Sequence, residues 1–334
     1  ESISRVLLKC ISMIEKKSRE YEIEDVFRTY GVLTREAGFY FYFSRKIREL
    51  RESGHEGTAR AYASSLRSMQ RYLGKKDFPF IKLSSRIISD YQGKLLASGI
   101  CDNTIGFYLH NIKALFRKGC REMGLELPCP FRDISIKTEK TLKRSLDPVV
   151  IKTLSAIELE KDSPLSLARD IFMFSFYTRG MSFVDIALLK KRHVFPGEIC
   201  YRRHKTDQLM RVGINKEISR ILERYKNVPG EYIFPLFPAE RDPYAGYRSA
   251  YHRIRYSLGK ISRVIGLEFP LRLHAARHSW ATIAKVNGAS VHVIGECLGH
   301  TSEKTTRIYL KELDHSALDA VNNQVADFIL AVDD

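Results

Sequence analysis

Apolar residues recur three or four positions apart along most of the chain, a spacing typical of amphipathic helices. The first 35 residues predict one such helix and an irregular link. Between residues 36 and 130 the pattern predicts four more helices, each ending near a glycine or serine stop signal. These run from Phe39 to Glu52, from Thr58 to Gly74, from Ser84 to Ser98 and from Asn103 to Gly119. We therefore expect a helical extension over residues 1–35 and a helical domain over 36–130.

The helical pattern breaks over residues 131–146, where proline, lysine and short polar residues predict a basic linker. A second domain is expected over residues 147–313. Its pattern predicts helices near 149–160, 165–177, 184–190, 216–226, 247–264, 276–287 and 291–298, and a strand pair near 198–203 and 210–214. Residues 314–334 predict a short helix whose apolar side chains should be buried somewhere. The expected fold class is mainly α with a small β-hairpin or sheet (α+β).

The net charge of the chain limits the kinds of partner that it is expected to bind. The 334 residues include 55 Lys+Arg and 39 Asp+Glu, a formal charge of +16, although the segment after residue 311 is acidic. A folded, basic body of this kind favours a polyanion, most often nucleic acid. An anionic membrane surface, an acidic protein or a protein that is basic only for solubility remain open on charge alone. Basic residues at 113, 117 and 121 share one helix face, which is either a solvated face or a phosphate contact.

Other classes are excluded by composition. No apolar run approaches the ~18–20 residues of a membrane-spanning helix. The first segment has no features of a secretion signal, and the six cysteines form no CxxC pair. Reduced thiols and a cytoplasmic location are therefore expected. No phosphate-binding glycine loop and no carboxylate cluster of the two-metal type is visible, so no metal or other cofactor is expected.

Four segments contain residues suited to chemistry. In LRLHAARHSWATIAK, His274 and His278 lie four apart on a predicted helix with Arg277 between them. This spacing is found in zinc proteases, but Ala275 occupies the position of their general base, so that class is disfavoured. Surface histidines on a helix are the plain alternative.

The other three segments are also unspecific when taken singly. In CLGHTSEKTTRIYL, Tyr309 follows His300 by nine residues and could be a buried aromatic. In FYTRGMSFVDIALL, Arg179 lies at the end of an apolar helix. In YRRHKTDQLMRVGI, Lys205 precedes a predicted turn.

Their order and spacing together are specific. An arginine, a hairpin lysine, H-x-x-R, L-G-H and a tyrosine nine residues later resemble the catalytic set of the tyrosine recombinase (phage integrase, Xer-like) family, of the kind found in mobile-element integrases. The resemblance covers about residues 38–330 and is strongest in HSWATIAKVNGASVHVIGECLGHTSEKTTRIY. It implies a helical core DNA-binding domain followed by a tyrosine recombinase catalytic domain. One position departs from the family pattern T-G-x-R-x-S-E-L, because Ser182 stands where its arginine belongs.

The resemblance implies a DNA strand transferase that forms a 3′-phosphotyrosyl intermediate. Tyr309 would be the nucleophile, with His274 as its proton acceptor. Arg277 and Arg179 would stabilise charge on the phosphate, Arg179 in place of the arginine displaced by Ser182. Lys205 would protonate the departing 5′-oxygen, and His300 would donate a hydrogen bond to a phosphate oxygen.

The expected partners are duplex DNA at a specific recombination site and other copies of the chain in a tetrameric synapse, with no membrane. In that family terminal helices such as 316–330 dock on a neighbouring protomer, although packing within one chain is the alternative. Residues 1–35 are expected to contact DNA or a partner. The DNA-contact residues predicted outside the catalytic set are Thr58, Arg60, Asn103, Thr104, Lys113, Arg117 and Lys140. Two alternatives stay open: a type IB topoisomerase-like enzyme that relaxes DNA, and a non-catalytic DNA-binding module with the same fold.

Overall fold

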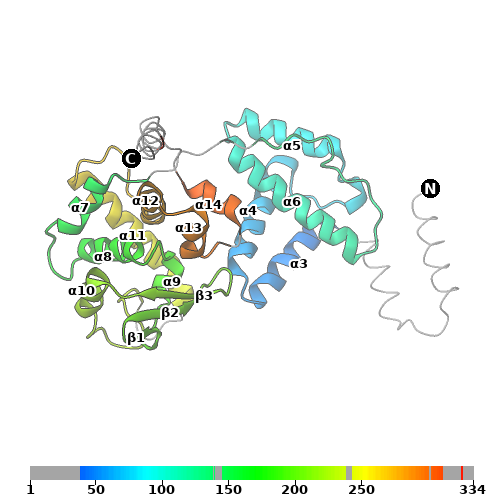
Figure 1. Cartoon of the computed structure of the whole chain (residues 1–334). Coiled ribbons are helices and arrows are strands. Elements are labelled where there is room, and N and C mark those ends of the chain that lie inside the picture. Colours follow the sequence, from blue (N-terminus) through cyan, green and yellow to red (C-terminus); the bar gives the residue numbers. More distant parts are fainter. Residues whose placement is uncertain are drawn as a thin grey trace, which may run out of the picture. The chain divides into compact units, whose positions relative to one another are not determined.

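The computed structural model describes residues 38–137, 139, 145–237, 243–300, 302–310 and 325. Contacts within the chain divide it into a first unit, Glu1–Thr141, and a second unit, Leu142–Asp334, and each is described by itself. The predicted extension 1–35, Lys140 and the predicted tail helix, apart from Val325, lie outside the described residues. Figure 1 shows the elements of both units, labelled along the chain.

The first unit is helical, as the spacing predicts. Its elements are α3 (Phe39–Glu52), α4 (Glu56–Leu73), the 3-10 turn η1 (Phe80–Lys82), α5 (Ser85–Ala97) and α6 (Asp102–Glu122). The helix predicted from Phe39 to Glu52 has the same ends in the structure, and the other three differ by a few residues. Their inner faces form one apolar core around residues such as Phe43, Met69, Tyr91 and Leu109.

The start of α3 is held by a residue distant in the sequence. The Asp77 carboxylate accepts hydrogen bonds from the backbone N–H groups of Tyr40 (2.8 Å) and Phe41 (2.9 Å). A Cβ atom at Gly38 would lie 2.1 Å from Asp77 Oδ2, so a side chain there would displace this carboxylate. Because the free N–H groups at a helix start favour a carboxylate, this contact both caps α3 and fixes the chain that leads to η1.

The second unit places one small sheet beside a helical core. In chain order it contains α7 (Pro148–Ala156), α8 (Pro164–Tyr177), α9 (Phe183–Ala187), η2 (Lys191–His193), β1 (Val194–Phe195), β2 (Glu198–Arg202), β3 (Leu209–Gly213), α10 (Lys216–Arg224), α11 (Pro243–Val264), α12 (Leu273–Val286), α13 (Val291–Leu298) and α14 (Glu303–Tyr309). The expected class, mainly α with a small sheet, is confirmed. The helix predicted near 149–160 ends earlier, because Ile157 leaves the helical conformation.

Helix α8 lies at the centre of the second unit, in contact with α7, α10, α11 and α12 (Figure 1). Its residues Ile171, Phe172 and Phe174 are fully buried. A helix that is apolar on most of its surface needs neighbours on several sides, which α8 has. The end of α8 therefore has a fixed position, and the turn that follows it leads into the candidate site.

The sheet is antiparallel, in the order β1-β2-β3. Tyr201 of β2 pairs with Met210 of β3, and both side chains are buried. Because side chains alternate across a strand, Ile199 and Tyr201 face the core, and the next residue on that face is Arg203. The short strand β1 was not predicted, because two residues give no alternation to detect.

Two further findings bear on the expected class of protein. The helices of the described residues are all too short or too polar to cross a membrane. The cysteines that the structure describes, Cys101, Cys120, Cys129, Cys200 and Cys297, are all free.

Close packing in the first unit gives a testable prediction. A Cβ atom at Gly119, in the last turn of α6, would lie 2.5 Å from the ring of Phe80, whereas one at Gly93 in α5 would have nothing within 4 Å. We expect Gly119→Ala to lower the free energy of unfolding by about 1–3 kcal/mol through overpacking. Gly93→Ala, the matched control, should raise it by up to about 1 kcal/mol, because alanine favours a helix. Urea unfolding measures both, and equal effects would contradict the packing argument.

Candidate active site

Arg277 of α12 is the buried centre of the site, with 6% of its surface exposed. Its Nη1 donates to the carbonyl oxygen of Gly180 (2.8 Å), and its Nη2 donates to the carbonyl oxygen of Leu298. Nη2 also lies 2.9 Å from Nε2 of His300. The guanidinium is therefore tied to the turn after α8 and to the end of α13, two segments far apart in the sequence.

The backbone conformation of the turn after α8 allows it to approach Arg277 closely. Arg179 (φ 59°) and Gly180 (φ 76°) are both left-handed, a conformation that costs an arginine about 1 kcal/mol. A Cβ atom at Gly180 would lie 2.5 Å from Cγ of Arg277. Glycine is thus needed at 180 for the close approach, and the carbonyl group at this turn reaches the guanidinium.

His300 lies two residues after the end of α13 and is neutral. Burial, together with the nearby charges of Arg277, Arg203 and Lys205, lowers its pKa to about 4. Since a guanidinium only donates hydrogen bonds, Nε2 of His300 must accept from Arg277. The ring proton is then on Nδ1, which lies 3.1 Å from the hydroxyl of Thr306. In this arrangement His300 orients Arg277, and its Nε2 has no proton to donate to a phosphate.

Arg203 also belongs to the site, although it was not among the predicted residues. Its Nη1 donates to the carbonyl oxygen of Gly299, next to His300. The alternation of side chains along β2 could have identified it, because this alternation places Arg203 on the same inward face as Ile199 and Tyr201. An arginine on the core-facing side of a hairpin end is unusual enough to indicate a function.

Lys205 is exposed in the turn between β2 and β3. Ser182, which stands where the family pattern has an arginine, helps to hold that turn. Ser182 caps α9, and its hydroxyl donates to Oδ2 of Asp185 (2.6 Å). Oδ1 of Asp185 accepts from the backbone N–H of His204 (2.8 Å), the neighbour of Lys205. Ser182 is thus one end of a brace that supports the hairpin, in contrast to the anion-binding role that an arginine would have there.

Arg179 lies at the edge of this group. Its Nη1 is 3.5 Å from the carbonyl oxygen of Arg211 on β3. Burial and Asp185 raise the pKa of Tyr201, while Arg203, Arg277 and Arg179 lower it, so all three guanidiniums are near that ring. Of these three, Arg203 and Arg277 also lower the pKa of His300, whereas Arg179 is not among the causes of that shift. Arg203 is therefore the more central of the two candidates for the displaced arginine.

The remaining members of the predicted set lie on α12 and α14. His274 is exposed, one helical turn before Arg277, and its ring meets that of His278 edge to face at 4.7 Å between centroids. Tyr309 is the last residue of α14, and its side chain lies outside the described part of the structure. The structure therefore brings Arg203 and Arg277 to the same short segment, residues 298–300, with Lys205 and Arg179 close by.

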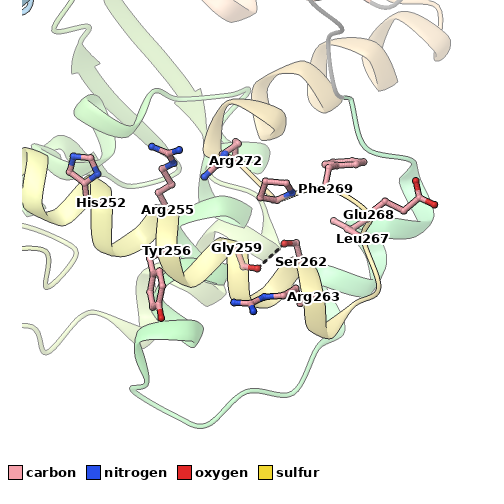
Figure 2. Close-up of a pocket in the computed structure, with 11 residues that line it drawn as sticks. His252, Arg255, Tyr256, Gly259, Ser262, Arg263, Leu267, Glu268, Phe269 and Arg272 are labelled. Atoms are coloured by element: carbon pink, nitrogen blue, oxygen red, sulfur yellow. Dashed lines mark hydrogen bonds between the residues drawn. The ribbon is translucent and has the colours of Figure 1, made fainter.

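A basic pocket of about 570 Å³ lies between α11 and the segment that leads into α12 (Figure 2). Its cations are Arg255 and Arg263 of α11 and Arg272, two residues before His274. In Figure 2 these side chains surround the hollow together with Tyr256, whose ring is 4.8 Å from Nζ of Lys260. No ion pair among the described residues includes these three arginines. Glu268 also lines the pocket, but no ion pair among the described residues joins it to these arginines, so the concave surface keeps an excess of positive charge.

The DNA-contact residues predicted in the first unit differ in their surroundings. Thr58 and Arg117 are exposed, and Lys113 and Thr104 are partly exposed. Nε of Arg60 pairs with Oε1 of Glu56 at 2.8 Å. Asn103 donates to the carbonyl oxygen of Glu139 and accepts from its N–H, so its amide fixes the end of the unit. Lys140 lies outside the described residues.

Sequence profiles of two families match the chain. The phage integrase family matches residues 145–315, which include every residue of the site. The phage integrase SAM-like domain matches residues 38–131, in the first unit. The two matches fall on either side of the predicted linker.

Individual proteins give the same result. Tyrosine recombinase XerC of Shewanella oneidensis is 26% identical over 226 residues, which are 65% of this chain and 70% of the relative. Tyrosine recombinase XerD of Pseudomonas putida is 24% identical over 262 residues, 76% of this chain and 86% of the relative.

Two solved structures have a similar fold. One is a lambda integrase dimer bound to a COC′ core site (TM-score 0.62, 17% identity, covering 83% of this chain and 98% of that one). The other is the Tn1549 transposon integrase in complex with a circular intermediate DNA (TM-score 0.62, 14% identity, covering 86% and 99%). With the site geometry and the profile over residues 145–315, these matches show that the chain belongs to the phage integrase family, the family of tyrosine recombinases.

Proposed function

We propose that this chain is a site-specific recombinase that cuts and rejoins duplex DNA through a 3′-phosphotyrosyl intermediate at Tyr309. The observation that carries the proposal is the fixed pair of guanidiniums, Arg277 and Arg203, held around His300 at the base of the helix that ends in Tyr309. Arg179, Arg203 and Lys205 form no ion pair among the described residues, so their charge is available to an anion.

The guanidiniums would act on the phosphate. As Tyr309 attacks, negative charge develops on the non-bridging oxygens of a five-coordinate phosphorus. Donors that are already held in place stabilise this charge without reorganisation. Arg277 is held by two backbone carbonyls and His300, and Arg203 by the Gly299 carbonyl. We assign to His300 the orientation of Arg277, and to Arg203 the role of the arginine that Ser182 displaces.

Proton transfers complete the step. The phenol oxygen of Tyr309 bonds to phosphorus, its proton passes to His274, and the bond from phosphorus to the 5′-oxygen breaks. Lys205 gives a proton to that oxygen, which leaves a 5′-hydroxyl. The tyrosyl ester stores the energy of the diester, so a 5′-hydroxyl of another strand can reverse the step and rejoin the DNA without ATP.

The basic pocket would hold DNA beside the cleaved phosphate. Helix α11 contains five Lys or Arg residues and no Asp or Glu. Arg272 is two residues from His274, so phosphates bound in the pocket would continue towards the active site. Contacts of this kind give affinity and register, and they make binding depend on salt.

Recombination joins two DNA sites, so we propose that the chain works as a tetramer of protomers. A lambda integrase tetramer bound to a Holliday junction has a similar fold (TM-score 0.58). We propose the cytoplasm as the location, since the described cysteines are free thiols. The topoisomerase-like alternative is not favoured, because the curated relatives quoted above are named recombinases.

The nucleophile is tested by the covalent adduct. Nicked duplexes with randomised sequence around the nick trap a phosphotyrosyl product, because the short cleaved end diffuses away. We expect the unaltered chain to form an adduct whose DNA sequence identifies the target site, and Tyr309→Phe to form none while binding DNA equally well. Gel electrophoresis under denaturing conditions measures the adduct. An adduct with Tyr309→Phe would exclude Tyr309, and its absence with the unaltered chain would contradict the proposed function.

The displaced arginine is tested by two variants that remove the same charge. Arg203→Ala should lower the rate of adduct formation about 100- to 1,000-fold, the usual loss for one fixed donor to a developing oxyanion. Arg179→Ala should lower it less, because Arg179 contacts the carbonyl of Arg211 on β3, whereas Arg203 contacts Gly299 beside His300. Single-turnover rates at saturating protein measure both. The reverse order would return the role to Arg179.

The pocket is tested by the salt dependence of binding to a non-specific duplex. Replacing Arg255 and Arg272 with Ala should reduce the slope of log K against log salt by roughly 0.9 for each phosphate that these two side chains neutralise. Arg220→Ala is the control, since Arg220 is exposed on α10 of the same unit and already pairs with Glu217 at 2.9 Å. Fluorescence anisotropy over a series of NaCl concentrations gives the slopes. An unchanged slope in the pocket variant would show that DNA does not use this surface.

A further inference from the structure

Helix α14 is too short to hold its own position. It has seven residues, and isolated helices of that length are unstable in water. The side chain of Thr306 is fully buried, and Leu310, just after the helix, packs on a small apolar cluster. The other described side chains of the helix, Glu303, Lys304, Thr305 and Arg307, are exposed. Among the described side chains of α14, that of Thr306 is therefore the buried one that can hold the helix in place.

Thr306 meets both the site and the neighbouring helix. Its hydroxyl lies 3.1 Å from Nδ1 of His300. A Cβ atom at Gly295 of α13 would lie 2.9 Å from the same oxygen, so this glycine allows the close approach of the two helices. The hydroxyl thus fits into a space bounded by α13 and the imidazole.

The direction of this hydrogen bond follows from the other side of the ring. Arg277 can only donate, so Nε2 of His300 accepts and the proton is on Nδ1. Nδ1 therefore donates to Thr306. A continuous series of contacts runs from the Gly180 carbonyl through Arg277 and His300 to α14. Tyr309 is three residues after Thr306 in the same helix, so a contact that holds Thr306 also holds the backbone that leads to Tyr309.

We propose that Thr306 is a positioning residue, whose hydroxyl ties the helix that ends in Tyr309 to the Arg277–His300 pair. The nucleophile is then in place only when the groups that receive the phosphate charge are in place too. This proposal rests on the proposed function. Thr305, the neighbouring threonine, is exposed and has no part in it.

Three variants separate the hydroxyl from the shape of the residue. Thr306→Val keeps the shape but cannot accept a hydrogen bond, Thr306→Ser keeps the hydroxyl, and Thr305→Val is the control. On the randomised nicked duplexes at saturating protein, Thr306→Val should form adduct about 100-fold more slowly, a loss typical of a misplaced reacting group. Thr306→Ser and Thr305→Val should stay close to the original rate. DNA affinity should be unchanged in all three, and the melting temperature should be unchanged in Thr306→Ser and Thr305→Val.

Thr306→Ala repeats the loss of the hydroxyl, so the proposal stays testable if the valine variant fails to fold. Nitrogen NMR of the full chain with labelled histidines gives a second measurement that needs no DNA, with His300→Asn to identify the His300 signals. We expect the unaltered chain to show the proton on Nδ1, and these signals to move in Thr306→Val but not in Thr305→Val.

The outcomes distinguish the two proposals. Adduct from the unaltered chain and from Thr306→Val at equal rates overturns the positioning role alone, as does a His300 proton on Nε2. Absence of adduct from the unaltered chain overturns the proposed function and, with it, any role of Thr306 in the reaction.

Discussion

The site depends on the burial of one guanidinium. Arg277 gives up most of its water, and such a charge is costly unless its donors are satisfied. The carbonyls of Gly180 and Leu298 and the ring of His300 supply acceptors from two segments far apart in the sequence, the turn after α8 and the end of α13. Each of those segments must therefore be in place for Arg277 to be stable where it is. The contacts that stabilise the fold around Arg277 are thus the same contacts that orient its guanidinium.

Around this fixed group, cations differ in how they are held. Arg277 and Arg203 are anchored by carbonyl oxygens, which orient a guanidinium but leave its charge in place. Elsewhere in the second unit, carboxylates take that part, as where Asp170 receives Arg169 and Arg224. A guanidinium held by neutral acceptors keeps its full charge and still attracts a phosphate. In an ion pair, the carboxylate neutralises most of that charge. The choice of partner thus separates cations that stabilise the protein from cations that can bind DNA.

Gly180 and Ser182 explain the unusual sequence of the segment that follows α8. At Gly180 a side chain would collide with Arg277, and Arg179 accepts a left-handed conformation so that this turn can form. Ser182 then caps α9 and, through Asp185, supports the hairpin that contains Arg203 and Lys205. Under the proposed function, Arg203 takes the place of the family's arginine at 182, because the hairpin that Ser182 supports holds Arg203 at the Gly299 carbonyl.

Local pattern was enough to determine much of this protein. The helical spacing gave α3 to within a residue and the core helix α8, and the order of Arg179, Lys205, His274, Arg277, His300 and Tyr309 was enough to indicate the family. These features depend on residues close together in the chain or on motif spacing. Arg203, the tautomer of His300, the cap from Asp77 and the basic pocket depend on contacts between residues up to 97 positions apart, such as Arg277 with Gly180. Only the tertiary structure could decide them, because a sequence shows which groups can donate or accept but not which of them meet.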